Sequence, residues 1–126
     1  MARVLVIDDD EIIRNALARI LATAGHETVD AVNGRDGIDA LIRARFDVVI
    51  TDLVMPEQGG IETIQRVREL DPTIPIIAIS GAFGDETGAA LDGARQVGAN
   101  LSIEKPFRVE VLLSAVADAI SGRAVN

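Results

Sequence analysis

The 126-residue chain is long enough for one domain that buries roughly two-thirds of the surface of its unfolded form. A formal net charge of −8 and the lack of Trp and Tyr argue against nucleic-acid binding, which needs a basic face and stacking side chains. Without cysteine, a signal peptide or an apolar run near the roughly 20 residues that cross a bilayer, we expect a cytoplasmic protein without disulfides or membrane insertion.

The first half of the chain alternates short apolar runs with helical patterns. RVLVI, residues 3–7, is a β-branched run typical of a strand that is buried on both faces. Residues 11–25 place apolar side chains at helical spacing, and a glycine ends the pattern. We expect a second strand over residues 26–32, a second helix over 34–45 and another buried strand over 46–51.

The second half continues the same alternation. Residues 60–70 are predicted to be helical, and a strand follows over residues 74–79. A glycine-diluted helix is expected over residues 85–100, a short strand over 101–103 and a last amphipathic helix over 108–121.

Five strand–helix units with short links predict an α/β fold, in which a parallel sheet carries helices on both faces. The chain is too short for an eight-unit barrel, so we expect an open sheet in the flavodoxin-like strand order 2-1-3-4-5. The prediction is one domain over residues 1–122, with residues 123–126 as a C-terminal tail or the start of a linker.

Polar side chains gather where the predicted strands end, which is the edge of an open parallel sheet where ligands bind. Asp8 and Asp9 follow the first strand, and Asp52 follows the third. Ser80 follows the fourth strand, and Lys105 lies just beyond the fifth. The sequence therefore predicts a site that combines carboxylates, a hydroxyl group and an ammonium group.

The run of Asp8, Asp9 and Asp10 has two interpretations. Acidic side chains at a helix start cap free amides and favour the positive end of the helix dipole, which accounts for Asp10. Capping does not require three consecutive aspartates, nor a fourth, Asp52, on a neighbouring strand. Carboxylates held close together repel one another unless a cation joins them, and oxygen ligands suit Mg²⁺. A magnesium site is therefore the alternative to simple capping.

Asp52 also has two interpretations. The proline and glycines that follow it mark a loop, so it could be an acid in a turn. It could instead be a nucleophile that accepts a phosphoryl group as an acyl phosphate. Phosphoryl transfer mainly requires positioning and charge neutralisation, which a divalent metal and a lysine would supply. Ser80 and the Gly81 amide could then donate to the phosphoryl oxygens, although SGAFGDE could equally be a flexible turn.

Lys105 is the one lysine among twelve basic residues. A coding preference for arginine is the simplest explanation. However, a lysine brings a compact ammonium on a flexible stem, whereas arginine is a broad planar fork. The stem could cross the strand ends to a carboxylate or phosphoryl oxygen, and Pro106 is compatible with a cis peptide bond that aims it inward. We therefore interpret Lys105 as a site residue.

Five segments resemble, in order, the motifs of the receiver domain of two-component response regulators: VLVIDDDEIIR, DVVITDLVMPEQGGIE, IPIIAISG, VGAN and EKPF. The resemblance covers essentially the whole chain. It implies that Asp52 is the phosphoacceptor, charged by a sensor histidine kinase or a histidine phosphotransfer protein. It also implies that Ser80 and Lys105 bind the phosphoryl group.

The same resemblance implies a metal site and a switch. Mg²⁺ would be held by Asp8, Asp9, Asp52 and the backbone carbonyl of Val54. A shift of Ser80 and its loop would change the face built from the fourth helix, fifth strand and fifth helix, where a protein partner would bind. The backbone amides implied to help hold the phosphoryl group are those of Leu53, Val54 and Gly81.

Two departures from the family pattern concern this switch. The family usually carries an aromatic residue three positions before the lysine, which turns inward on activation, and here that residue is Ser102. The segment between Ser80 and Lys105 is also a few residues longer than usual, with an additional glycine-rich piece, GAFGDETGAA. Phe83 in that piece could replace the aromatic. We expect the output surface to differ from the usual one.

Two other function classes fit parts of the pattern. A phosphatase or phosphotransferase with an aspartate nucleophile could act on a small substrate. Enzymes of the haloacid dehalogenase type use a second aspartate two residues after the nucleophile, and that position is Val54 here. A flavodoxin-like cofactor binder is disfavoured because few aromatic residues are present to sandwich a flavin. We expect a phosphoacceptor that assists its own phosphorylation and dephosphorylation rather than an enzyme.

Some charged residues are expected to have no special role. Arg66, Arg68 and Glu69 are interpreted as an ordinary solvated helix face. His26, the only histidine, is expected at an exposed turn rather than in a metal site.

Overall fold

The computed structural model describes residues 2–53, 59–81 and 93–125. Its sheet has five parallel strands in the order β2-β1-β3-β4-β5, which confirms the predicted fold. The strands are β1 Arg3–Ile7, β2 Glu27–Ala31, β3 Val48–Asp52, β4 Ile76–Gly81 and β5 Leu101–Lys105. In the described residues, the helices are α1 Glu11–Thr23, α2 Gly34–Arg43, α3 Gly60–Leu70 and α5 Val109–Val125. Residues 93–97 are also helical.

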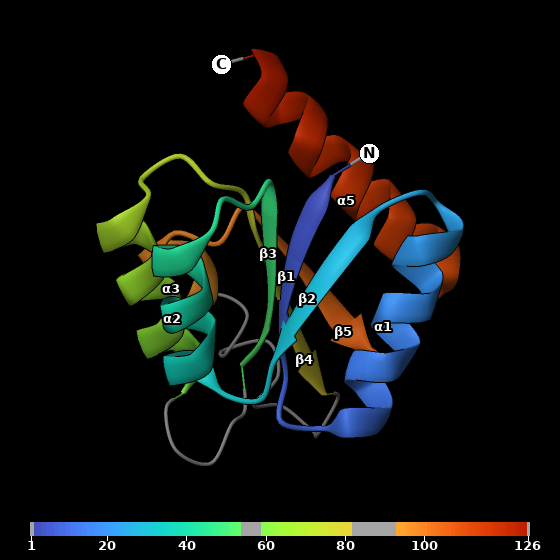
Figure 1. Cartoon of the computed structure of the whole chain (residues 1–126), viewed down its shortest axis with the longest axis horizontal. Coiled ribbons are helices and arrows are strands. Elements are labelled where there is room, and N and C mark those ends of the chain that lie inside the picture. The colour runs from blue at the N-terminus through green and yellow to red at the C-terminus, as the bar shows by residue number, and fades with distance from the viewer. Residues whose placement is uncertain (1, 54–58, 82–92, 126) are drawn as a thin grey trace.

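The sheet lies between two helical layers. Helices α1 and α5 cover one face, and α2 and α3 cover the other (Figure 1). Successive side chains of a strand point to opposite faces, so β1 contributes to both cores. Leu5 and Ile7 pack into the core under α2 and α3, whereas Val4 and Val6 pack into the core under α1 and α5. This double burial explains why the strand sequence is an unbroken apolar run.

The last three strands of the chain continue further than the apolar patterns predict. The expected strands end at residues 51, 79 and 103, whereas the observed ones end at Asp52, Gly81 and Lys105. Pairing of backbones continues because Ser80 lies opposite Glu104 and Gly81 lies opposite Lys105. Polar side chains at a sheet edge do not interrupt the backbone ladder, so the site residues are held by the sheet itself.

Helix α1 begins where the acidic run ends. Asp10 is the residue before the helix, and its side-chain Oδ1 accepts a hydrogen bond from the Ile12 amide at 2.9 Å. This confirms the capping interpretation for Asp10, because such a cap satisfies an amide that has no partner within the helix. Asp8 and Asp9 remain to be explained by other contacts.

Helix α3 begins against the end of β3 at Gly60. The Gly60 amide donates to the Leu53 carbonyl at 3.1 Å. A β-carbon at this position would lie 2.5 Å from the Asp52 carbonyl oxygen and would collide with the Cα of Leu53. Glycine therefore permits the close approach that fixes the backbone around Asp52.

Arg68 does not belong to a solvated helix face, so that expectation is wrong for this residue. Its Nη1 donates to the Ile74 carbonyl at 2.6 Å, and its Nη2 donates to the Gly98 carbonyl at 2.8 Å and to Asn100 Oδ1 at 2.7 Å. Gly98 has a φ of +126°, and a β-carbon there would lie 2.8 Å from Arg68 Cγ. Arg68 thus ties the end of α3 to the turns that enter β4 and β5.

The two ends of the chain also differ from expectation. The Ala2 amide donates to His26 Nδ1 at 3.1 Å, which leaves His26 partly buried rather than exposed in its turn. Helix α5 continues to Val125, whereas the sequence pattern predicts a helix that ends at residue 121. Within the described ranges, no helix is both long and apolar enough to cross a membrane.

We predict that Arg68→Met lowers the free energy of unfolding by about 2–3 kcal/mol, because several carbonyl oxygens lose a charged donor. Urea unfolding followed by circular dichroism measures the change. Arg66→Met is the matched control, since that side chain is 57% exposed and its contact with Glu69 is a 3.8 Å surface ion pair. A loss that is no larger for Arg68 than for Arg66 would contradict this role.

We predict that Gly60→Ala lowers the free energy of unfolding by about 1–3 kcal/mol, because the added β-carbon pushes α3 away from the end of β3. The same unfolding measurement applies. At Gly59 a β-carbon would meet nothing within 4 Å, so Gly59→Ala should cost less than about 1 kcal/mol. Similar losses in both variants would show that the close approach at Gly60 is not required.

Candidate functional site

The predicted polar strand ends meet at one edge of the sheet, at the lower end of the strands in Figure 1. Asp8 follows β1, Asp52 ends β3, Ser80 is next to last in β4 and Lys105 ends β5. Asp8, Asp52 and Ser80 are 2%, 6% and 2% exposed. Buried polar groups are normally hydrogen-bonded or paired with charge, so their neighbours define the site.

Lys105 places its ammonium group between two buried carboxylates. Its Nζ lies 3.1 Å from Asp8 Oδ2 and 3.6 Å from Asp52 Oδ2. The Lys105 side chain is 20% exposed. A buried carboxylate without a compensating charge is strongly destabilising, so this contact makes the pair of acids tolerable within the sheet edge. The peptide bond between Lys105 and Pro106 is cis, as expected.

The carboxylate of Asp8 is held by a second contact. Its Oδ1 accepts from the Asp10 amide at 2.9 Å, while its Oδ2 faces Lys105. The backbone amide of Asp8 donates to the Ala31 carbonyl at 3.1 Å, which continues the pairing of β1 with β2. Both carboxylate oxygens of Asp8 therefore have fixed directions.

Asp8, Asp9 and Asp52 form a cluster in which one carboxylate oxygen from each residue lies within 4.8 Å of the others. Asp9 is exposed, whereas the other two are buried. Lys105 lies beside two of these three carboxylates, Asp8 and Asp52, and brings one positive charge to them. Oxygen ligands with one side open to water suit Mg²⁺, which retains several waters when it binds to proteins. The residues present thus fit a divalent cation.

Ser80 lies beside Asp52 because of the strand register. Ile79 is the Cα partner of Asp52, and Ser80 is the next residue along β4. The structure therefore brings the predicted hydroxyl group to the same edge as the acids.

The structure describes two of the three backbone amides that were expected to help hold a phosphoryl group, those of Leu53 and Gly81. The Leu53 amide donates to the Ile79 carbonyl at 2.9 Å, so the sheet already uses this donor. Gly81 is the last residue of β4, directly opposite Lys105. Val54 lies outside the described residues, as does Phe83.

Sequence reasoning missed two residues that shape this edge. Arg14 donates from Nη1 to the Asp8 carbonyl at 2.8 Å and from Nε to Asp30 Oδ2 at 3.1 Å. The sequence places Gly60 between a loop and a predicted helix, and does not indicate that it lies against the backbone of Asp52. No local sequence signal marks either role, because the partners belong to other elements of the fold.

Comparisons with known proteins agree on a family. The model of the response regulator receiver domain matches residues 4–117. The chemotaxis protein CheY of Thermotoga maritima is 35% identical over 115 residues, which are 90% of this chain and 93% of that protein. A protein-glutamate methylesterase/protein-glutamine glutaminase of Anaeromyxobacter dehalogenans is 38% identical over 104 residues, which are 82% of this chain and 29% of that protein.

Solved structures give the same result. The chemotaxis protein CheY4 of Vibrio cholerae superposes with a TM-score of 0.85 at 33% identity, over 94% of this chain and 98% of that one.

The chain spans only 46%, 29% and 33% of the length of three of the curated relatives that it matches. Because the family model covers most of the chain and the relatives share its fold, this chain belongs to the response regulator receiver domain family.

Proposed function

We propose that Asp52 accepts a phosphoryl group from a sensor histidine kinase or a histidine phosphotransfer protein. The observation that carries this proposal is the position of its carboxylate, 3.6 Å from the Lys105 ammonium and within 4.8 Å of two further carboxylates. Phosphoryl transfer depends mainly on positioning and on balancing the charge of the transferring group. A nucleophile between an ammonium group and cation-binding acids meets both requirements.

In the proposed step, a carboxylate oxygen of Asp52 attacks the phosphorus of a phosphohistidine. The oxygen–phosphorus bond forms as the phosphorus–nitrogen bond breaks, and the departing imidazole nitrogen keeps the electron pair of that bond. The new acyl phosphate brings negative charge into a buried edge. Lys105 would offset part of this charge, and the hydroxyl of Ser80 would donate to a phosphoryl oxygen.

We assign Mg²⁺ to Asp8, Asp9 and Asp52, whose oxygen-only donor set suits a hard cation. The backbone carbonyl of Val54 is the further ligand that the family resemblance implies. When bound, the ion would neutralise charge on the phosphoryl oxygens and on the carboxylates. Asp8 would serve both the ion and Lys105, since a carboxylate offers about four lone-pair sites and the Asp10 amide and Lys105 each use one of them.

We further propose that phosphorylation changes the face formed by residues 93–97, β5 and α5. Strand β4, which carries Ser80, pairs along its length with β5. Arg95 in the 93–97 helix donates from Nη2 to Ser102 Oγ at 3.0 Å, where the family usually has an aromatic residue. A shift of β4 would therefore be transmitted through a polar contact rather than an aromatic side chain.

A groove on this face is the candidate site for a downstream protein partner. It is a shallow, open depression between β5 and α5 with a volume of about 470 Å³. Much of its lining is apolar, and protein interfaces combine an apolar core with a polar rim. The residues that line it are Leu101, Ser102, Ile103, Glu110, Val111, Ser114, Ala115 and Asp118.

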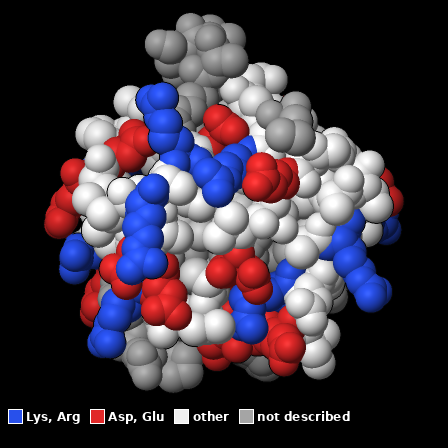
Figure 2. All heavy atoms as spheres, in the orientation of Figure 1, with Lys and Arg blue, Asp and Glu red and all other residues white. Residues whose placement is uncertain are grey.

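The proposed partners are proteins rather than nucleic acids. The formal net charge is −8, and acidic and basic side chains are interspersed on the face in Figure 2. The alternative function, a phosphatase acting on a small substrate, has Val54 where the second aspartate is needed. The family match also favours the phosphoacceptor.

We predict that acetyl phosphate adds a phosphoryl group to the wild-type protein only when Mg²⁺ is present. Intact mass spectrometry measures the adduct, and Asp52→Asn should abolish it because the nucleophilic oxygen is replaced by an amide nitrogen. Thermal unfolding of Asp52→Asn controls for loss of the fold. An adduct of equal size on Asp52→Asn, or no adduct on the wild type under any condition, would refute the proposed function.

We predict that phosphorylation shifts the backbone amide NMR signals of residues 93–97 and β5 more than those of β2 and α2. The reason is that β5 pairs with the strand that carries Ser80, whereas β2 lies at the far edge of the sheet. Spectra are compared before and after acetyl phosphate and Mg²⁺ are added. Asp52→Asn under the same conditions is the control. Shifts confined to the acidic strand ends would contradict the proposed switch.

A further inference from the structure

Arg14 in the first turn of α1 connects two acidic residues, Asp8 just after β1 and Asp30 in β2. Its Nη1 donates to the backbone carbonyl of Asp8 at 2.8 Å, and its Nε donates to the Asp30 carboxylate at 3.1 Å. The Arg14 side chain is only 11% exposed, whereas the Asp30 side chain is 55% exposed. Arg14 is thus a largely buried side chain whose guanidinium also binds an exposed carboxylate on β2.

The contact with Arg14 completes the set of partners around Asp8. The Asp8 amide donates to Ala31, its Oδ1 accepts from Asp10 and its Oδ2 accepts from Lys105. Arg14 supplies the partner for the remaining polar atom, the carbonyl oxygen. All four polar atoms of Asp8 are therefore hydrogen-bonded. Arg14 binds the carbonyl oxygen, which belongs to the peptide bond between Asp8 and Asp9.

We propose that Arg14 is a positioning residue for the metal site, a role that rests on the proposed function. By holding the Asp8 carbonyl, Arg14 fixes the backbone from which the Asp8 and Asp9 side chains depart. The two carboxylates and that of Asp52 repel one another, so the turn would relax outward if its backbone were free. Arg14 opposes that relaxation and keeps the three oxygens close enough for one divalent ion.

A simple surface ion pair between Arg14 and Asp30 does not account for these contacts. Exposed pairs contribute roughly 0–1 kcal/mol and do not fix a neighbouring backbone. Here the Arg14 side chain is largely buried, and one of its two hydrogen bonds reaches the backbone of a proposed metal ligand. Arginine suits this task because its planar fork donates in two directions, whereas a lysine offers a single ammonium.

The test is the dissociation constant for Mg²⁺ alone, measured by isothermal titration calorimetry without a phosphodonor. The chain has no Trp or Tyr, so calorimetry replaces intrinsic fluorescence as the readout. Arg14→Met should weaken Mg²⁺ binding by about tenfold to a hundredfold, which is typical for the loss of a residue that orients a metal ligand. Arg14→Lys should recover part of the affinity, since it still donates to one partner.

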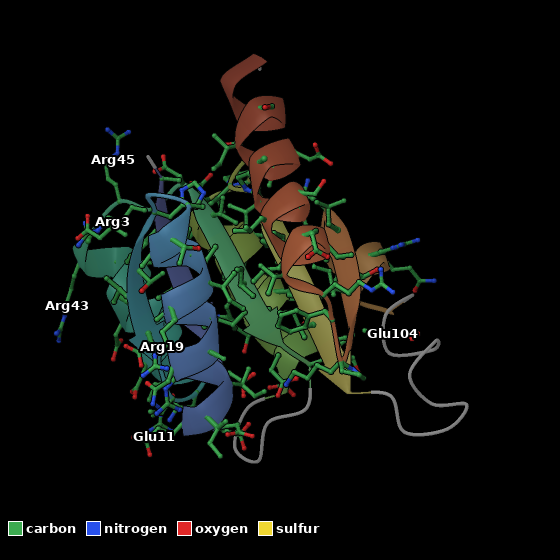
Figure 3. All side chains as sticks on the ribbon, turned by 90° about the vertical axis from the view of Figure 1, so that its right-hand side faces the viewer. Arg3, Glu11, Arg19, Arg43, Arg45 and Glu104 are labelled. Carbon is green, nitrogen blue, oxygen red and sulfur yellow. The ribbon has the colours of Figure 1, made fainter. Side chains whose placement is uncertain are left out.

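The matched control is Arg19→Met. Arg19 lies on the same helix, is exposed and is labelled in Figure 3, and its replacement changes the charge by the same amount. Its dissociation constant should equal that of the wild type within error. All titrations are run well below the unfolding temperature of each variant, so that lower stability alone does not change the result.

The outcomes separate the two proposals. If the wild type does not bind Mg²⁺, or if Asp9→Asn binds it as tightly as the wild type, the proposed metal site itself is wrong. If the wild type binds and Arg14→Met binds equally well, only the role of Arg14 is overturned. Asp30→Asn provides the second measurement should Arg14→Met fail to fold: a severalfold weaker affinity supports the proposal, and an unchanged affinity overturns it.

Discussion

The contact between the Lys105 ammonium and the carboxylates of Asp8 and Asp52 is the interaction on which this edge of the sheet depends. It joins the ends of β1, β3 and β5, which are far apart in the sequence. Burying two carboxylates costs free energy unless a positive charge lies beside them, and Lys105 provides it. Because the Lys105 ammonium offsets the negative charge of Asp8 and Asp52, a further negative charge at Asp52 would change the electrostatic balance at these strand ends.

The apolar sheet gives that edge its rigidity. Strands β1 and β3 are buried on both faces, so neither can shift without disturbing two cores. Gly60 brings the start of α3 against the backbone of Asp52, and Arg14 brings α1 to the backbone of Asp8. The acids are thus held from the sheet and from helices on both of its faces, which allows like charges to stay close together.

The sequence predicts the strand order and the meeting of Asp8, Asp52, Ser80 and Lys105, because apolar periodicity locates each strand and parallel strands end at one edge. It does not predict the role of Arg68, whose partners Gly98 and Asn100 lie about thirty residues away along the chain. Nor does the sequence predict that Gly60 lies against the backbone of Asp52, because a glycine at a helix start has no periodic signal that would indicate a close contact. The sequence also does not reveal that the Leu53 amide, expected to help hold a phosphoryl group, donates to the Ile79 carbonyl in this structure. Apolar periodicity therefore predicts the strands and the residues at their ends, whereas contacts that depend on tertiary packing cannot be predicted from the sequence.

The single lysine has a consequence for covalent chemistry at amines. Lys105 is the one side-chain amine in the chain, and it is 20% exposed at the very position where two acids need a positive charge. Acylation of a side-chain amine would therefore fall on this group, and it would remove the positive charge. Within these 126 residues no second lysine could be acylated in its place. Acylation of a lysine here would therefore always remove the positive charge beside Asp8 and Asp52.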